Sequence, residues 1–263
     1  MLSLSRKGRQ GGSVKGVGRM SNHKWQMAMS GALIASGAFS FAAAAGAAPA
    51  SATGATGAQG SKFTQQKQQL EQQLANRATQ LQHLLSDVQG AHSLTTQDAN
   101  TLSARITTEQ ASINALVAKV PNDATFAQLR ADRAAMLKDN RVYVVMTPQV
   151  FITIEGDSAL AQANVLVGNE ATLSSEVSSL NGLPGYQNAL NHYNKYVTRV
   201  AHVTTNMTSV VARVLAQTPQ GYPGNTHVFV SSNEQVRDAN ISMANASYDA
   251  SVIALATGGY TGS

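Results

Sequence analysis

Apolar residues spaced alternately three and four apart are the feature that most restricts how this chain can fold. The longest such stripe, which has no lapse, comprises Leu190, Tyr193, Val197, Val200, Thr204, Met207, Val211 and Val214. This spacing places all of them along one face of an α-helix. A helix with such a stripe is stable only when the stripe is buried against other helices, so the sequence predicts an all-α fold.

Two further stripes of this kind come earlier in the chain. The first comprises Phe63, Leu70, Leu74, Leu81, Leu84 and Val88, and the second comprises Leu102, Ile106, Ile113, Leu116 and Val120. Gly90 ends the first helix, Thr95 with Asp98 resembles a capping box at the start of the second, and Pro121 stops it. The short connection predicts that these two helices are antiparallel neighbours.

The remaining helical patterns follow in order. Residues 123–139 predict a third helix with Asp123 as its N-cap, and residues 158–180 predict a fourth. The segment Asn181-Gly182-Leu183-Pro184-Gly185 is a strong break. After the long stripe, residues 231–234 are expected to cap a final helix.

A dense β-branched and apolar run, RVYVVMTPQVFITI at residues 141–154, separates the two helical halves. One structure that fits it is a pair of strands, but the connection Thr147-Pro148-Gln149 lacks the Gly or Asn of a tight hairpin. The favoured alternative has residues 141–146 extended, with Thr147 capping a helix and Pro148 at its first position. The extended piece then needs a partner, either residues 228–230 or the surrounding bundle, which it would cross as buried coil.

These patterns predict an antiparallel helical bundle or elongated coiled-coil hairpins with one short extended crossover segment near 141–146. The helical domain spans residues 62–256, with a first helical half at 62–140, the crossover at 141–154 and a second helical half at 155–256. Residues 53–61, rich in small side chains, are expected to form a flexible linker. Residues 257–263 are expected to form a disordered tail.

The N-terminal residues 1–52 have the composition of a signal peptide. Basic residues precede an apolar run at residues 27–48, and Ala50-Ser51-Ala52 offers a small-residue cleavage site. The alternative is an uncleaved leader that anchors the protein at a membrane surface. Either Met1 or Met20 fits as the start of this leader. The prediction is a secreted or extracytoplasmic bacterial protein.

The net charge of +5 belongs to this leader. Of the 19 Lys and Arg residues, Arg6, Lys7, Arg9, Lys15, Arg19 and Lys24 precede residue 53, while all 14 Asp and Glu residues follow it, so the remainder carries 13 − 14 = −1. This balance argues against nucleic acid as a partner. The absence of cysteine excludes disulfides, thiolate metal ligands and a thiol nucleophile.

The crossover and a later loop carry a resemblance. The segments Arg141-Val142-Tyr143-Val144-Val145 and Pro148-Gln149-Val150 with Asp157, and the loop Gly221-Tyr222-Pro223-Gly224-Asn225, resemble those of uncharacterised secreted helical proteins of bacteria. The resemblance implies a helical exported protein and no particular activity.

One constellation points to catalysis. Gly156-Asp157-Ser158, preceded by an apolar run, resembles the nucleophile block of GDSL-type hydrolases, in which a serine at a strand end is activated by a histidine. The Gly-x-Asn-Asp block and the late Asp-x-x-His of those enzymes do not occur here. An envelope hydrolase using Ser158 is therefore the alternative hypothesis, and Asp157 or Ser158 beginning a helix is the favoured one.

No catalytic, cofactor-binding or metal-binding residue is predicted, and no cofactor. The histidines are scattered, and the basic residues Arg130, Arg133, Lys138 and Arg141 are interleaved with Asp132 and Asp139, which favours a solvated helix face. The predicted function is a structural or interaction role at the cell envelope or outside the cell. A partner helix or a homo-oligomer would pack against the heptad seams.

Overall fold

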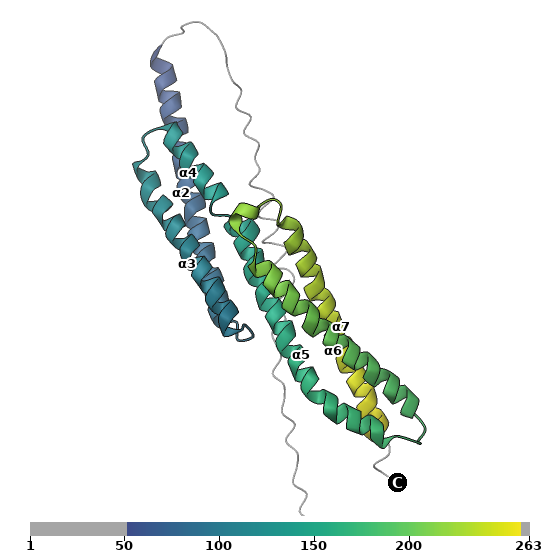
Figure 1. Ribbon diagram of the computed structural model, residues 1–263. Coiled ribbons are helices and arrows are strands. Elements are labelled where there is room, and N and C mark those ends of the chain that lie inside the picture. Colours follow the sequence, from purple (N-terminus) through teal and green to yellow (C-terminus); the bar gives the residue numbers. More distant parts are fainter. Residues whose placement is uncertain (1–51, 259–263) are drawn as a thin grey trace, which may run out of the picture. The chain divides into compact units, whose positions relative to one another are not determined.

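The computed structural model describes residues 52–258, with side chains from residue 59 onward, and every regular element in this range is helical. The long elements are α2 (Ala52–Gly90), α3 (Thr96–Lys119), α4 (Phe126–Lys138), α5 (Thr147–Ser179), α6 (Tyr186–Leu215) and α7 (Thr226–Gly258). Three short turns, η1 (Val120–Asn122), η2 (Val142–Met146) and η3 (Pro219–Gly221), lie between them. The prediction of an all-α fold with antiparallel helix packing is confirmed (Figure 1).

The first two stripes pack against each other in a hairpin of α2 and α3. They form one buried cluster whose members include Leu70, Leu74, Leu81, Leu84, Leu102, Ile106 and Ile113. Thr95 is the N-cap of α3, and its side chain accepts a hydrogen bond from the Asp98 amide, as the sequence predicts. Because consecutive turns of both helices contribute to one cluster, the hairpin is held together by its apolar seam.

The α4 helix packs against α2, and its start differs from the prediction. Thr125, not Asp123, is the N-cap, and its side chain forms a capping box with Gln128. The Phe126 ring at the first turn lies edge-on to Phe63 of α2, with 5.2 Å between ring centroids. Asp123 is instead buried in the preceding turn, because η1 continues the chain for one more turn beyond α3.

The second half is a bundle in which α5, α6 and α7 all contact one another (Figure 1). The predicted break after α5 is confirmed, and Gly182 and Gly185 both have positive φ there, a conformation that glycine adopts without a steric cost. The α6 stripe is flanked by a second buried row, Ala189, Tyr196, Val203 and Val210. Two rows are needed because α6 packs against two helices rather than one.

The prediction of an extended crossover segment near 141–146 is wrong. Val142–Met146 is a π-helical turn, in which the Thr147 amide donates to the carbonyl of Val142 and the chain continues directly into α5. The proposed strand partner, residues 228–230, belongs to the first turns of α7. A helix satisfies its own backbone groups, so this buried run requires no partner strand. The favoured prediction of a helix that starts at this point is confirmed, and α5 runs without a break through Gly156 to Ser179. The predicted cap is wrong: Met146 is the N-cap, no side chain caps the helix, and the Thr147 hydroxyl donates to the carbonyl of Val142.

Two predictions at the ends of the helical domain are also wrong. The segment 53–61, expected to be a flexible linker, forms the first turns of α2 and contains no proline to interrupt the helix. The α7 helix begins at Thr226, earlier than expected, and continues through Gly258, so the first two residues of the expected tail are helical. Residues 259–263 and most of the predicted signal peptide lie outside the described residues.

The first half of α5 is buried on every side. Its buried residues are Thr147, Pro148, Gln149, Val150, Ile152, Thr153, Ile154, Gly156, Asp157 and Ala159. Val150 and Ile154 pack into the cluster formed by α2, α3 and α4. On another side, the Gln149 side chain donates to the carbonyls of Val214 and Gln217 at 2.8 and 3.1 Å, and so satisfies groups that the end of α6 leaves open.

Arg77 and Glu109 stand at polar positions within the apolar seams of α2 and α3, and both are half-buried. The Arg77 guanidinium lies over the Tyr143 ring of η2, 5.1 Å from its centroid. Burial, with a smaller effect from the charge of Asp139, raises the pKa of Glu109 to about 7. A group whose pKa is raised by folding is destabilising when ionised, so Glu109 lowers stability as the pH rises from about 4.5 through 7.

No helix among the described residues is long and apolar enough to cross a membrane.

Gly156 allows α5 and α6 to approach closely. A Cβ atom at this position would lie 2.7 Å from Cγ2 of Val211, a buried side chain with restricted rotamers. At Gly168, further along the same helix, an added Cβ would meet nothing within 4 Å.

We predict that Gly156→Ala lowers the free energy of unfolding by about 1–3 kcal/mol, because overpacking outweighs the gain in helix propensity. The matched substitution Gly168→Ala should raise it by up to about 1 kcal/mol. Urea unfolding followed by circular dichroism measures both. Equal effects of the two substitutions would contradict the close approach.

Candidate functional site

Ser158 lies in the interior of α5, so it is not at the end of a strand, and the favoured hypothesis that Asp157 or Ser158 begins a helix is wrong as well. Its Oγ accepts a hydrogen bond from Nε2 of Gln162, one turn later, at 3.3 Å. Among the described residues no histidine forms a hydrogen bond with it. The arrangement that suggested a GDSL-type nucleophile was a strand followed by an active serine, and the helix removes that argument. Asp157, its neighbour, is the residue of this segment with an unusual environment.

The histidines do not form a metal site in the described part of the chain, where no group of three or more His, Cys, Asp or Glu residues has the geometry to hold an ion. His83, His92 and His202 are exposed on different helices or loops. His192 alone contacts a buried carboxylate, described below.

The basic residues before the crossover are largely solvated, as expected: Arg130 and Lys138 are exposed, and Arg133 and Arg141 are half-buried. Asp132, expected to lie on that face, is 2% exposed and binds Nζ of Lys119 at 2.5 Å. The Arg141 guanidinium lies over the Tyr222 ring, 4.3 Å from its centroid. These contacts use two of the charges within the fold and reduce what the segment offers to an anion.

A cleft of about 550 Å³ opens where the start of α3 meets α5 and α6. Asp157 lines it from α5 and is 2% exposed; its Oδ2 accepts a hydrogen bond from the Thr95 amide at 3.1 Å. Its Oδ1 is buried, and no N–H or O–H group among the described residues donates to it. Asp98 lines the same cleft from α3. The cleft therefore contains two carboxylates, one of which has an unsatisfied oxygen.

The electrostatics of Asp157 follow from this position. Burial is the main cause that raises the pKa of Asp157, the hydrogen bond from the Thr95 amide opposes it, and the charge of Asp98 and a hydrogen bond between the two carboxyl groups add to it, so that the pKa lies at about 6. The carboxyl group is thus ionised at neutral pH only at a cost in free energy. A cation in the cleft would remove that cost.

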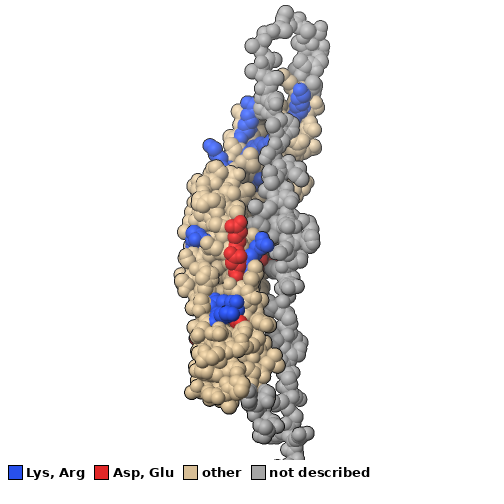
Figure 2. Space-filling view, turned by 90° about the vertical axis from the view of Figure 1, so that its right-hand side faces the viewer, with Lys and Arg blue, Asp and Glu red and all other residues tan. Residues whose placement is uncertain are grey.

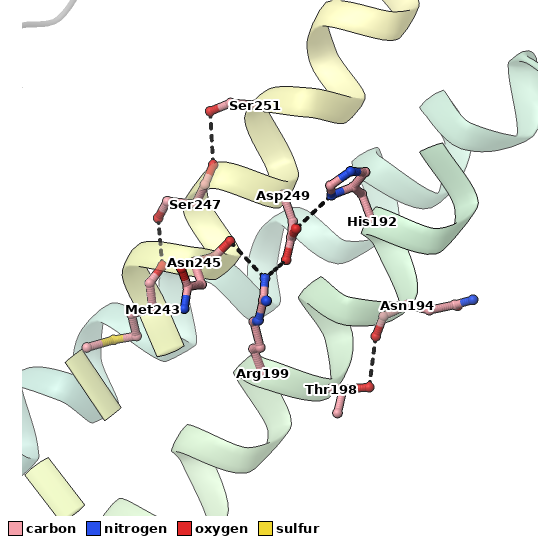
Figure 3. Close-up of polar contacts among 9 residues, drawn as sticks. All are labelled: His192, Asn194, Thr198, Arg199, Met243, Asn245, Ser247, Asp249 and Ser251. Atoms are coloured by element: carbon pink, nitrogen blue, oxygen red, sulfur yellow. Dashed lines mark hydrogen bonds and ion pairs between the residues drawn. The ribbon is translucent and has the colours of Figure 1, made fainter. Parts of the chain in front are cut away.

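A second buried carboxylate, Asp249 of α7, binds two basic side chains of α6 (Figure 3). Oδ1 lies 2.7 Å from Nδ1 of His192, and Oδ2 accepts from Nη1 of Arg199. Nη1 of Arg199 also donates to the carbonyl of Asn245 at 3.2 Å. Asp249 is 1% exposed, and both of its carboxylate oxygens have partners on α6. We interpret this cluster as a polar lock between α6 and α7.

The outward face of α7 carries a third feature, an exposed stripe with the same three-and-four spacing as the buried seams. We call Ile241, Ala244, Tyr248, Ser251 and Leu255 the α7 stripe. Its large members Ile241, Tyr248 and Leu255 are 59%, 63% and 77% exposed. After Asp238 the only charged residue of α7 is the buried Asp249. Figure 2, which views the side where α6 and α7 lie in Figure 1, shows a described surface with few charges.

No protein-family model, curated protein or solved structure matches the chain. The resemblance to secreted helical proteins of bacteria therefore stays a prediction. The arguments about function rest on the three features above.

Sequence reasoning found none of these features as sites. The partners of Asp157 and Asp249 come from residues 62 and 57 positions away, so no local spacing indicates them. One signal was present: Asp249 is the only charge in an otherwise uncharged helical segment, and such a residue on an apolar row is commonly buried with a partner.

We predict that Asp249→Asn lowers the free energy of unfolding by about 2–3 kcal/mol, because His192 and Arg199 lose their shared carboxylate in a buried setting. Asp238→Asn removes the same charge from an exposed position of the same helix and should change it by less than about 0.5 kcal/mol. Thermal unfolding of both variants provides the comparison. A loss no larger in Asp249→Asn than in Asp238→Asn would exclude the lock.

Proposed function

We propose that the protein is an exported helical protein with an interaction role, and that its partner is a second copy docked through the α7 stripe. The observation that carries the proposal is the stripe itself: a regular row of exposed apolar and small residues without charge. Scattered exposed apolar residues are ordinary on protein surfaces, whereas a contiguous row at coiled-coil spacing is typical of a helix contact.

Because the heptad seams are buried, we place the partner helix on the exposed α7 stripe. The stripes of α2 and α3 are buried against each other, and the end of the α6 stripe, Met207, Val211 and Val214, is buried inside the second half. The expected docking of a partner on these seams would require the bundle to open. The α7 stripe is available without any rearrangement.

The sizes along the stripe favour a second copy. In an antiparallel pair of helices, a large residue at one seam position faces the alternate seam position of the partner. With a twofold axis between residues 249 and 250, Tyr248 faces the partner's Ser251 and Leu255 faces the partner's Ala244. Each layer then joins one large and one small side chain, which is the pairing that fills space best. A twofold arrangement repeats both layers on the other side of the axis.

The charge and length of the α7 stripe determine how tightly the two copies are expected to bind. No like charges face each other across the axis, so charge repulsion does not oppose association, and no ion pairs reinforce it. Residues 241–255 cover about 22 Å of helix. A single helix pair of this length lies at or below the ~1,200 Å² lower end of stable interfaces. We therefore expect a reversible dimer.

The pairing can be tested with introduced cysteines, since the natural chain has none. We predict that Tyr248→Cys/Ser251→Cys gives a disulfide-linked dimer on mild oxidation, because these two positions face each other in the proposed layer. The matched control is Val165→Cys/Gly168→Cys, an exposed pair with the same spacing on α5. Non-reducing gel electrophoresis measures the yield.

Equal cross-linking of the two pairs would mean that random collision accounts for the dimer. Sedimentation of the unmodified protein gives a second readout. A chain that stays monomeric at millimolar concentration would exclude a second copy as the partner.

Export is supported by the sequence of residues 1–52, where the basic residues precede an apolar run and a small-residue site. We predict that the protein recovered from the culture medium of a producing bacterium begins near Thr53. Mass spectrometry of the intact protein measures this. Recovery only from the membrane fraction, with the leader retained, would support anchoring at the membrane surface instead.

A further inference from the structure

The cleft between α3, α5 and α6 has a composition that the proposed α7 contact does not use. We propose that it binds an organic cation: a primary ammonium group carried on an apolar chain. The inference goes beyond the proposed function and is independent of it, since none of the residues that line the cleft comes from α7.

The polar end of the cleft favours a positive charge. Asp157 and Asp98 both line it, and no Lys, Arg or His does. No N–H or O–H group donates to the buried Oδ1 of Asp157, and its carboxyl group hydrogen-bonds that of Asp98 only while the pair holds a proton, whereas buried carboxylate oxygens are normally hydrogen-bonded. A donor that carries positive charge satisfies both the missing hydrogen bond and the charge.

The type of cation follows from the remaining ligands. A calcium or magnesium ion takes six or more oxygen ligands, and no group of three or more acidic or histidine side chains in the described chain is placed to hold an ion. An ammonium group needs only three acceptors. Asp157, Asp98 and the hydroxyl of Thr101 or Thr208, which also line the cleft, supply that number.

The other walls of the cleft favour an apolar chain next to the charge. Leu160 lines it from α5, and Val211, Ala212 and Leu215 line it from α6. The volume of about 550 Å³ lies within the ~300–1,000 Å³ of small-molecule sites, more than an ammonium group alone would occupy. Burying an alkyl chain along these side chains contributes about 0.8 kcal/mol per methylene group.

Protonation of the site sets the pH dependence of binding. The titratable groups that face the cleft are Asp157 from α5 and Asp98 from α3, and α6 contributes none. The pKa of Asp157 is raised to about 6 in the free protein. Above that pH the carboxylate is ionised and attracts the cation, and below it the proton competes. Binding should therefore weaken as the pH falls from 7.5 to 5.

The test is an NMR titration of the full chain at pH 7.5 with n-octylammonium, using the Thr95 amide as the reporter. We expect saturable binding, with 1-octanol and octanoate at least tenfold weaker. Asp157→Asn keeps an acceptor for the Thr95 amide and removes the charge, so it should weaken octylammonium binding at least tenfold. Asp238→Asn, the exposed control, should leave it unchanged.

A second variant protects the test against misfolding. If circular dichroism shows that Asp157→Asn is not folded, Asp98→Asn, which removes the other carboxylate of the cleft, must weaken binding at least threefold. Octanol that binds as tightly as octylammonium, or variants indistinguishable from the control, would overturn the proposal.

The ammonium group has two natural carriers, a free amphiphile and a lysine side chain. N-acetyl-lysine methylamide distinguishes them within the same titration. If it binds as well as octylammonium, the group is presented by a peptide. If only octylammonium binds, the ligand is a small amphiphilic amine.

Discussion

The first half of α5 is the part on which the rest of the structure depends, because it is buried by both helical halves at once. Val150 and Ile154 extend the core of α2, α3 and α4, while Gly156 brings the helix against Val211 of α6. Gln149 caps the end of α6 with its side-chain amide. A helix that is enclosed in this way must be apolar around most of its circumference, and its polar residues must find partners inside the protein.

This enclosure explains which parts of the fold could be predicted from the sequence. The α2, α3 and α6 stripes are one-sided, so their three-and-four spacing identifies the helices. Gly90 and Pro121 mark the ends of α2 and α3, and residues 181–185 mark the break between α5 and α6. Residues 141–154 have no polar face, and a buried helix and a buried strand then give the same continuous apolar run. Turn chemistry excluded the hairpin, but nothing local distinguished an extended piece from the π-helical turn of η2. The β-branched residues of this run favour an extended structure, but burial on every side outweighed that propensity.

The polar sites were less predictable than the helices, for a related reason. A buried carboxylate is identified by its partners, and these lie far away along the chain: Thr95 for Asp157, and His192 with Arg199 for Asp249. The sequence shows each aspartate as an interruption of an apolar pattern and nothing more. The Gly156-Asp157-Ser158 segment was singled out because of its serine, but the residue with an unusual environment is its aspartate. Its serine faces a glutamine one turn away, whereas its aspartate reaches the start of another helix.

Low charge connects the buried sites with the proposed partner surface. Beyond the leader the chain carries 14 acidic residues, and Asp123, Asp132, Asp157 and Asp249 among them are buried within the fold. Long stretches of helix surface are consequently left without either sign, and the C-terminal half of α7 is one of them. Flanking ion pairs usually set which helices pair and in which direction. Where such ion pairs are absent, the order of large and small side chains is the remaining source of specificity. Along the α7 stripe large and small side chains alternate, and the order is the same when it is read backwards, so two antiparallel copies can pair large with small residues.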